Sequence, residues 1–155
     1  MSPRIIPVPG LYLFHWSHHL TVVPMVKPKF SELIQSPLHS FPASWCGLKA
    51  TEKRGVSVIY SPRGKVLHVG GTPRGQLGIC QRLGNHLHGQ SSFTNKSKYL
   101  RQHGGRRLKE RYTYVRERCT YRCLVIEDDR MRVLLEAYAI GHLCPGHVGL
   151  HQVVG

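Results

Sequence analysis

Short apolar runs separated by turn residues occupy the middle of the chain. Residues 56–60 and 66–69 flank residues 61–64, which read Ser-Pro-Arg-Gly. Because proline and glycine favour tight turns and β-branched residues favour strands, this stretch predicts a β-hairpin. A third run, residues 119–129, alternates and then becomes continuously apolar. Such a run is typical of a central strand.

The segment after the hairpin has a helical period. Its regularly spaced apolar residues are Leu77, Cys80, Leu83 and Leu87. Arg82 and His86 are four residues apart, so a helix places them side by side on one surface. A polar, basic loop should follow, then a short helix around residues 96–102.

A second long helix is expected near the end of the chain. Asp128 or Asp129 can cap its first turn, and Pro145 should end it. The expected apolar stripe comprises Val133, Leu134, Ala137, Ile140 and Gly141. Glu136 is a lone acid in the middle of this helix.

The first fifty residues differ from the rest because prolines recur in them. Each proline removes a backbone donor and restrains the residue before it, so long regular elements are not expected there. We interpret residues 1–50 as an irregular extension that wraps the core, and residues 51–155 as the folded domain. Within the extension, residues 10–16 and 20–26 are short strand candidates, and residues 30–36 suit a turn or two of helix.

The charge balance indicates the class of partner. The 155-residue chain has 22 Lys and Arg against 8 Asp and Glu, with 11 His in addition. Self-repulsion of this excess opposes folding, while its field attracts polyanions, so nucleic acid is the leading partner. The alternative is a basic surface without a specific ligand.

The cysteines and the hydropathy of the chain indicate where in the cell the protein is expected. The five cysteines are an odd number, and the first residues lack the basic-then-apolar pattern of a signal peptide. We therefore expect a cytoplasmic protein with reduced thiols. No apolar run approaches the length that spans a bilayer, so no membrane partner is expected.

One basic stretch is dense enough to track a phosphate backbone. The cations expected to bind nucleic acid are Lys96, Lys98, Arg101, Arg106, Arg107, Lys109 and Arg111. Tyr99, Tyr112 and Tyr114 lie among them and can stack on bases. The alternative is a solvated loop, since two glycines at 104–105 interrupt any helix. A second set of cations, in the extension, could add a clamp: Arg4, Lys27 and Lys29.

The order of these features is strand, strand, helix with arginine and histidine, strand, helix with glutamate. This order resembles the GIY-YIG nuclease family. Residues 55–57 (Gly-Val-Ser) stand where the first signature motif is expected, and residues 68–70 (His-Val-Gly) where the second is expected. The resemblance implies an α+β fold with a small, mostly antiparallel three-stranded sheet flanked by helices.

The resemblance also implies roles for individual residues. Ser57, His68, Arg82 and His86 take the catalytic positions, and Glu136 takes that of the ligand to one Mg²⁺ or Mn²⁺. Both signature tyrosines are replaced, by serine at 57 and histidine at 68, and valine at 148 stands where the family has asparagine. A serine hydroxyl is not a base, whereas an imidazole titrates near neutrality, so we expect His68 or His86 to move the proton.

The expected function is that of a metal-dependent endonuclease, of restriction, mobile-element or repair type. It would hydrolyse double-stranded DNA, with RNA as an alternative substrate. A two-fold homodimer would allow one site to act on each strand. The other expectation is a non-catalytic DNA- or RNA-binding protein that kept the scaffold and lost the tyrosines.

Each candidate residue also has a structural interpretation. Glu136 could pair with Arg132 on the helix surface, and His68 could be a hydrogen-bonded core residue. A structural zinc site is a further alternative, although the spacing of its cysteines argues against it. Its potential ligands are Cys119, Cys123, His142, Cys144, His147 and His151.

Overall fold

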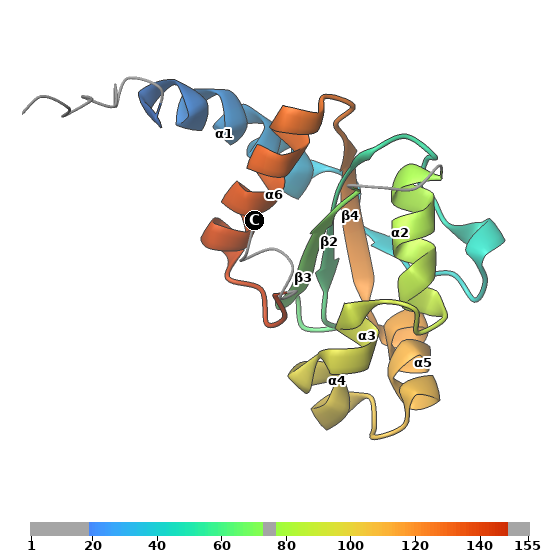
Figure 1. The fold of residues 1–155 in the computed structure, drawn as a ribbon. Coiled ribbons are helices and arrows are strands. Elements are labelled where there is room, and N and C mark those ends of the chain that lie inside the picture. Colours follow the sequence, from blue (N-terminus) through green and yellow to red (C-terminus); the bar gives the residue numbers. More distant parts are fainter. Residues whose placement is uncertain (1–18, 73–76, 149–155) are drawn as a thin grey trace, which may run out of the picture.

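The computed structural model describes residues 19–72 and 77–148 of the chain. They form an α+β fold around a four-stranded antiparallel sheet with the strand order β1–β4–β2–β3 (Figure 1). The strands are β1 (His39–Ser40), β2 (Gly55–Tyr60), β3 (Val66–Gly71) and β4 (Thr120–Val125). The predicted hairpin is confirmed as β2 and β3, and the predicted central strand as β4.

The expected three-stranded sheet is corrected to four strands. β1 adds an edge strand of two residues, in which His39 pairs with Tyr121 and Ser40 with Thr120. A two-residue strand leaves no alternating pattern in the sequence, so periodicity could not reveal it.

Helices cover both faces of the sheet (Figure 1). One face carries α2 (Gly78–Leu87), α3 (Ser92–Lys96), α4 (Lys98–His103) and α5 (Leu108–Arg118). Its core includes Ile59, Leu83, Phe93 and Tyr121, each 1% exposed or less. The other face carries α1 (His19–Gln35) and α6 (Asp129–Leu143), and a short 3-10 turn, η2 (Trp45–Gly47), precedes β2. Among the described residues, no helix is both long and apolar enough to cross a bilayer.

Helix α1 overturns the expectation of irregular structure before residue 50. It spans 17 residues, so the strand expected at residues 20–26 is wrong, whereas the helical turns expected near residue 30 belong to its last part. Pro24 and Pro28 lie inside it at exposed positions. Val26, Phe30 and Leu33 form a buried stripe with α6 and the sheet, so apolar packing outweighs the two missing backbone donors. The strand candidate at residues 10–16 lies outside the described residues.

Helix α6 begins as predicted, because the Asp128 side chain accepts a hydrogen bond from the Met131 N–H at 2.7 Å. Its predicted apolar stripe is wrong in part, because Leu134 and Ile140 pack against the core whereas Val133, Ala137 and Gly141 are exposed. Leu135 and Ala139 are buried with no exposure, while Val133 is 60% exposed. The helix carries apolar residues nearly all round, so the pattern alone could not select the buried face.

Candidate active site at the end of strand β3

A β-bulge sets the orientation of His68. His68 pairs with Ile59 but Val66 pairs with Tyr60, so Leu67 is an extra residue in β3. The bulge places Leu67 and His68 on the same face, toward α2 and α3. The His68 ring stacks on Phe93 at 5.2 Å between centroids and lies 5.3 Å from the His86 ring.

His86 comes from α2 and is completely buried. Its Nδ1 lies 2.8 Å from the Ser91 hydroxyl, and Ser91 in turn lies 2.9 Å from the Thr94 hydroxyl. Ser91 also caps α3 by accepting the Thr94 N–H. These contacts leave Nε2 as the ring nitrogen of His86 that has no described partner.

The buried imidazoles are neutral at physiological pH. Burial, with smaller contributions from the nearby Arg82 and His147, lowers the pKa of His68 to about 3. Burial, followed by the charges of His68, Arg82 and His147, lowers the pKa of His86 well below 6.5. The expectation that His68 titrates near neutrality is therefore wrong for the protein alone, because its burial was not visible in the sequence.

Arg82 lies one helical turn before His86 and contacts the end of β3. A Cβ placed on Gly70 would lie 3.2 Å from Arg82 Nε and Nη2, and 3.0 Å from His68 Nε2. Glycine at this position thus allows the guanidinium to approach the strand. Burial lowers the pKa of Arg82, and the negative charge of Glu136 opposes that shift, so the guanidinium stays charged.

Glu136 approaches the same strand end from α6. A Cβ on Gly71 would lie 2.4 Å from Glu136 Oε2, so only glycine leaves room for the carboxylate there. Arg132, the alternative partner of Glu136, pairs with Asp129 and donates to the Ile126 carbonyl. Two adjacent glycines, Gly70 and Gly71, therefore lie between the arginine and the carboxylate.

The site holds buried nitrogen atoms that lack partners. Within the described part of the chain, no hydrogen bond reaches Arg82 Nε, His86 Nε2 or either ring nitrogen of His68. A buried donor left without an acceptor costs roughly 1–3 kcal/mol. Arg82 Nε–H is a donor, and each neutral imidazole also has one N–H. This set of donors suits a ligand rich in acceptor oxygens.

A divalent cation fits this site only if water and substrate supply most of its ligands. Across residues 19–72 and 77–148, no three His, Cys, Asp or Glu side chains gather as a ligand set. Glu136 is a single, half-buried carboxylate. Mg²⁺ often binds one protein carboxylate and completes its shell with water and substrate phosphate, which is compatible with Glu136. The zinc alternative gains no support from the described residues, and His151 lies outside them.

Ser57 lies on the expected face of the sheet, but its hydroxyl already makes a hydrogen bond. It is 1% exposed, pairs with Gly70 across the hairpin, and its hydroxyl donates to the Gly70 carbonyl at 3.3 Å. Tyr60, on the same strand, packs in the core of the opposite face and does not replace the missing tyrosine. Val148, where the family has asparagine, is 40% exposed.

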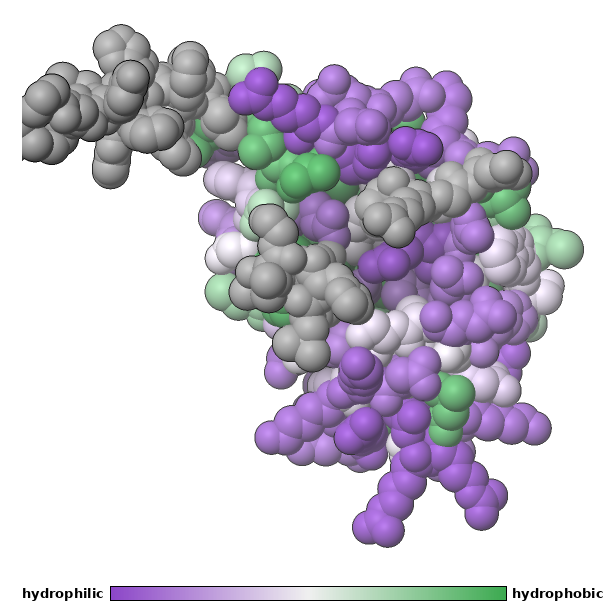
Figure 2. Space-filling model, viewed as in Figure 1, coloured by the Kyte–Doolittle hydropathy of each residue, from purple (hydrophilic) through white to green (hydrophobic). Residues whose placement is uncertain are grey.

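The predicted phosphate-binding cations gather around α3, α4 and α5. Figure 2 shows long hydrophilic side chains projecting from this end of the molecule. The exposed members are Lys96, Lys98, Arg101, Arg106, Arg107 and Lys109. Arg111 differs, since it is only 7% exposed. Helices α3, α4 and α5 carry most of this segment, so the alternative of an irregular loop holds only for residues 104–107, where the two glycines do interrupt the helices.

Three residues of the site were not identified from the sequence. Phe93 stacks on His68, and Gly71 contacts Glu136. His147, considered only as a zinc ligand, donates its backbone N–H to the Leu67 carbonyl and lies 5.7 Å from the His68 ring. The glycine pair after a strand was a usable signal for Gly71, whereas Phe93 and His147 had none.

Comparisons with protein-family models, with curated proteins and with solved structures found no match to this chain. We therefore argue its function from the chemistry of the residues at the end of β3.

Proposed function

We propose that this protein is a metal-dependent endonuclease that hydrolyses phosphodiester bonds in DNA, with a site similar to that of GIY-YIG nucleases. One observation carries the proposal. Arg82 and Glu136 approach Gly70 and Gly71 from opposite helical layers, next to buried nitrogen atoms for which the described residues supply no acceptor. The strongly basic composition supports a polyanionic substrate.

Arg82 is suited to bind the scissile phosphate. A guanidinium binds phosphate oxygens with a planar fork, and its charge offsets the charge that grows in the transition state. Partial burial strengthens this interaction, because less water screens it. Glu136 would hold Mg²⁺ or Mn²⁺, whose charge would polarise a phosphate oxygen and help the leaving oxygen depart.

The histidines act as neutral groups in the unliganded protein. An imidazole offers one N–H to a phosphate oxygen and one lone pair to a water proton. A bound phosphate raises the pKa of the adjacent His68 from about 3, since a nearby negative charge favours the imidazolium. His68 would therefore accept a proton only with substrate present. His86 Nε2 is free to meet a phosphate oxygen, because Ser91 engages Nδ1.

A second candidate function is nucleic-acid binding without cleavage, to DNA or RNA. The hydroxyl of Ser57 is engaged with the Gly70 carbonyl, and His68 is a weak base in the free protein. Ser57 and His68 both replace tyrosines of the family. The protein could therefore keep the basic charge and the fold without the ability to cleave. A homodimer remains a proposal for the catalytic form, because cutting both strands with one site per chain favours two-fold symmetry.

A plasmid-nicking assay with Mg²⁺ or Mn²⁺ tests the proposal. Glu136→Gln keeps the shape of the side chain and removes its charge, so we expect cleavage to be lost while DNA affinity persists. Arg82→Lys keeps the charge but loses the planar fork, and the rate should fall by roughly two orders of magnitude or more.

Glu117→Gln is the matched control, because Glu117 is an exposed glutamate on α5, away from the end of β3. It should cleave like the parent. If the parent binds DNA but never cleaves it with either metal, the second candidate function replaces the first. Cleavage by Glu136→Gln at the parent rate would show that the cleavage does not depend on Glu136, as expected of a contaminating nuclease, and would refute the proposed site.

A further inference from the structure

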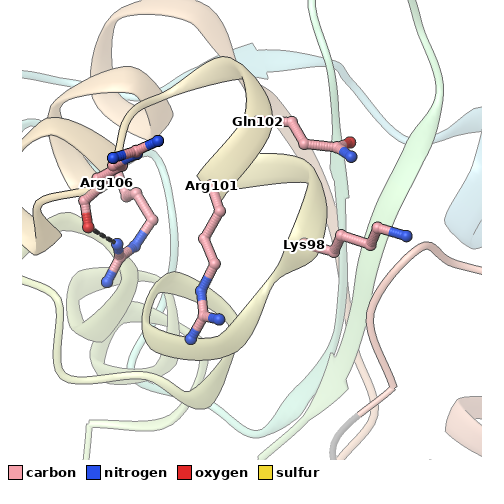
Figure 3. A pocket seen from close by; sticks show the side chains of 5 residues that line it. Lys98, Arg101, Gln102 and Arg106 are labelled. Atoms are coloured by element: carbon pink, nitrogen blue, oxygen red, sulfur yellow. Dashed lines mark hydrogen bonds between the residues drawn. The ribbon is translucent and has the colours of Figure 1, made fainter.

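A basic cavity lies beside α4 and the start of α5. The cavity, of about 470 Å³, is lined by Lys98, Arg101, Gln102, Arg106 and Arg111 (Figure 3). We call these five residues the basic pocket. Every charged residue of the pocket is a cation. None of the four pairs with an acidic side chain in the part of the chain that the structure describes.

Arg111 gives this pocket a fixed geometry. Its Nε donates to the Thr94 carbonyl at 2.8 Å, and a terminal guanidinium nitrogen donates to the Arg106 carbonyl, the bond dashed in Figure 3. Arg101 is also held, through a 3.3 Å hydrogen bond to the Asn95 carbonyl. Neutral carbonyls satisfy donors but leave the positive charges uncompensated. The pocket therefore presents preorganised cations at a low entropic cost of ligand binding.

We propose that the basic pocket binds one phosphate group of a nucleic-acid strand. A phosphate supplies negative charge and several acceptor oxygens, which match arginine donors. The Gln102 amide adds a neutral polar group to the same cavity. The proposal rests on the proposed function only in taking nucleic acid as the ligand, and not on cleavage.

The pocket and the candidate active site are joined through α3. Arg111 bonds the Thr94 carbonyl, the Thr94 hydroxyl contacts Ser91, and the Ser91 hydroxyl contacts His86. Burial lowers the pKa of His147, and the charge of Lys96, an exposed residue of α3, lowers it further. A strand with one phosphate at Arg82 can thus cross α3 past Lys96 and place a further phosphate in the pocket. Occupation of both points would fix the direction of the strand.

Two double variants with equal loss of charge test the proposal. Arg101→Gln with Arg106→Gln removes cations of the pocket, whereas Arg63→Gln with Arg130→Gln removes exposed cations outside it. Affinity for a DNA duplex is measured by fluorescence anisotropy at several salt concentrations, with EDTA present to prevent cleavage.

We expect the pocket variant to lower the slope of log affinity against log salt by about one, the effect of a single lost phosphate contact. At 0.1 M salt this corresponds to a roughly tenfold loss of affinity. The control variant should change the slope and affinity clearly less. Equal losses in the two variants would overturn the proposal, because they indicate a diffuse basic surface. Thermal melts verify that both variants are folded.

The phosphate could come from the strand interior or from its end. Single strands with a 5′-phosphate and with a 5′-hydroxyl distinguish these sources. A pocket effect that persists with the 5′-hydroxyl strand assigns a backbone phosphate, and one that requires the 5′-phosphate assigns a strand end. Plasmid nicking is scored separately, so loss of the pocket effect in a protein that still cleaves refutes the pocket alone. A protein that never cleaves but shows the slope change retains the pocket and loses the nuclease function.

Discussion

Acid should unfold this protein through its buried histidines. His68 is 3% exposed and His86 fully buried, and neither has a carboxylate among its described ring or hydrogen-bond partners. In the unfolded chain both imidazoles take up protons below about pH 6.5. In the folded chain His68 stays neutral until about pH 3. The stability that these groups contribute is therefore complete above pH 6.5 and is lost as the pH falls toward 3.

The magnitude follows from proton linkage. For each imidazole that is neutral in the folded chain and charged in the unfolded chain, the free energy of unfolding falls by about 1.4 kcal/mol for every unit by which the pH is lowered. Between pH 6.5 and pH 5, His68 alone accounts for about 2 kcal/mol, and His86 acts in the same direction because burial also lowers its pKa. A domain with a total stability of roughly 5–15 kcal/mol loses a large part of it over this interval.

Urea unfolding at several pH values between 7 and 4 measures this effect. His68→Phe keeps a ring against Phe93 and removes the titrating group, so its free energy of unfolding should depend less steeply on pH, by about one proton. His88→Phe is the control, because His88 is exposed. Equal pH slopes for the parent and His68→Phe between pH 6.5 and 4.5 would show that His68 is not held neutral by the fold.

Two further expectations concern packing. Gly71→Ala adds a Cβ 2.4 Å from Glu136 Oε2, and the flexible carboxylate should move away, so plasmid nicking should fall sharply with little change in melting temperature. If this variant nicks the plasmid at the parent rate, the position of Glu136 is not needed for cleavage. Leu83→Ala leaves a cavity at a site with no exposure and should cost about 2–5 kcal/mol in urea unfolding, whereas Leu38→Ala, at a 51% exposed site, should cost less than about 0.5 kcal/mol. Similar losses for both leucines would contradict the assigned core.

The sequence predicted elements wherever one face alone is apolar or a turn is marked by proline and glycine. The hairpin and the α2 helix meet these conditions, whereas the start of α6 was predicted from its Asp128 cap. Helix α5 was missed because its polar sequence buries only Arg111 and Val115. Helix α1 was missed because local rules for proline cannot include the stabilisation that its partners provide.

The sequence identified residues of the candidate site, but it could not predict how they are buried and packed. Spacing on α2 identified Arg82 and His86, and the position of Glu136 in α6 followed from its helix. Their approach to the end of β3 depends on the packing of two helical layers, which no local pattern encodes. The pKa of His68 depends on burial by Phe93 and its neighbours, so the chemistry assigned to it from the sequence had to change.

The bulge in β3 makes Leu67 the one position of the strand where loss of a residue preserves the facing of the site. Without Leu67, Val66 would still face α6 and His68 would still face α2, because Leu67 is the extra residue between their two pairs. Loss or gain of two residues within the strand would preserve the facing of every later side chain. In the exposed turn at residues 62–65 an odd or an even change in length is accommodated before pairing resumes. Among variants of this chain, single-residue deletions should thus preserve the facing of His68 in the turn and at Leu67, whereas a deletion at Val69 would put His68 and Gly70 on opposite faces of the sheet.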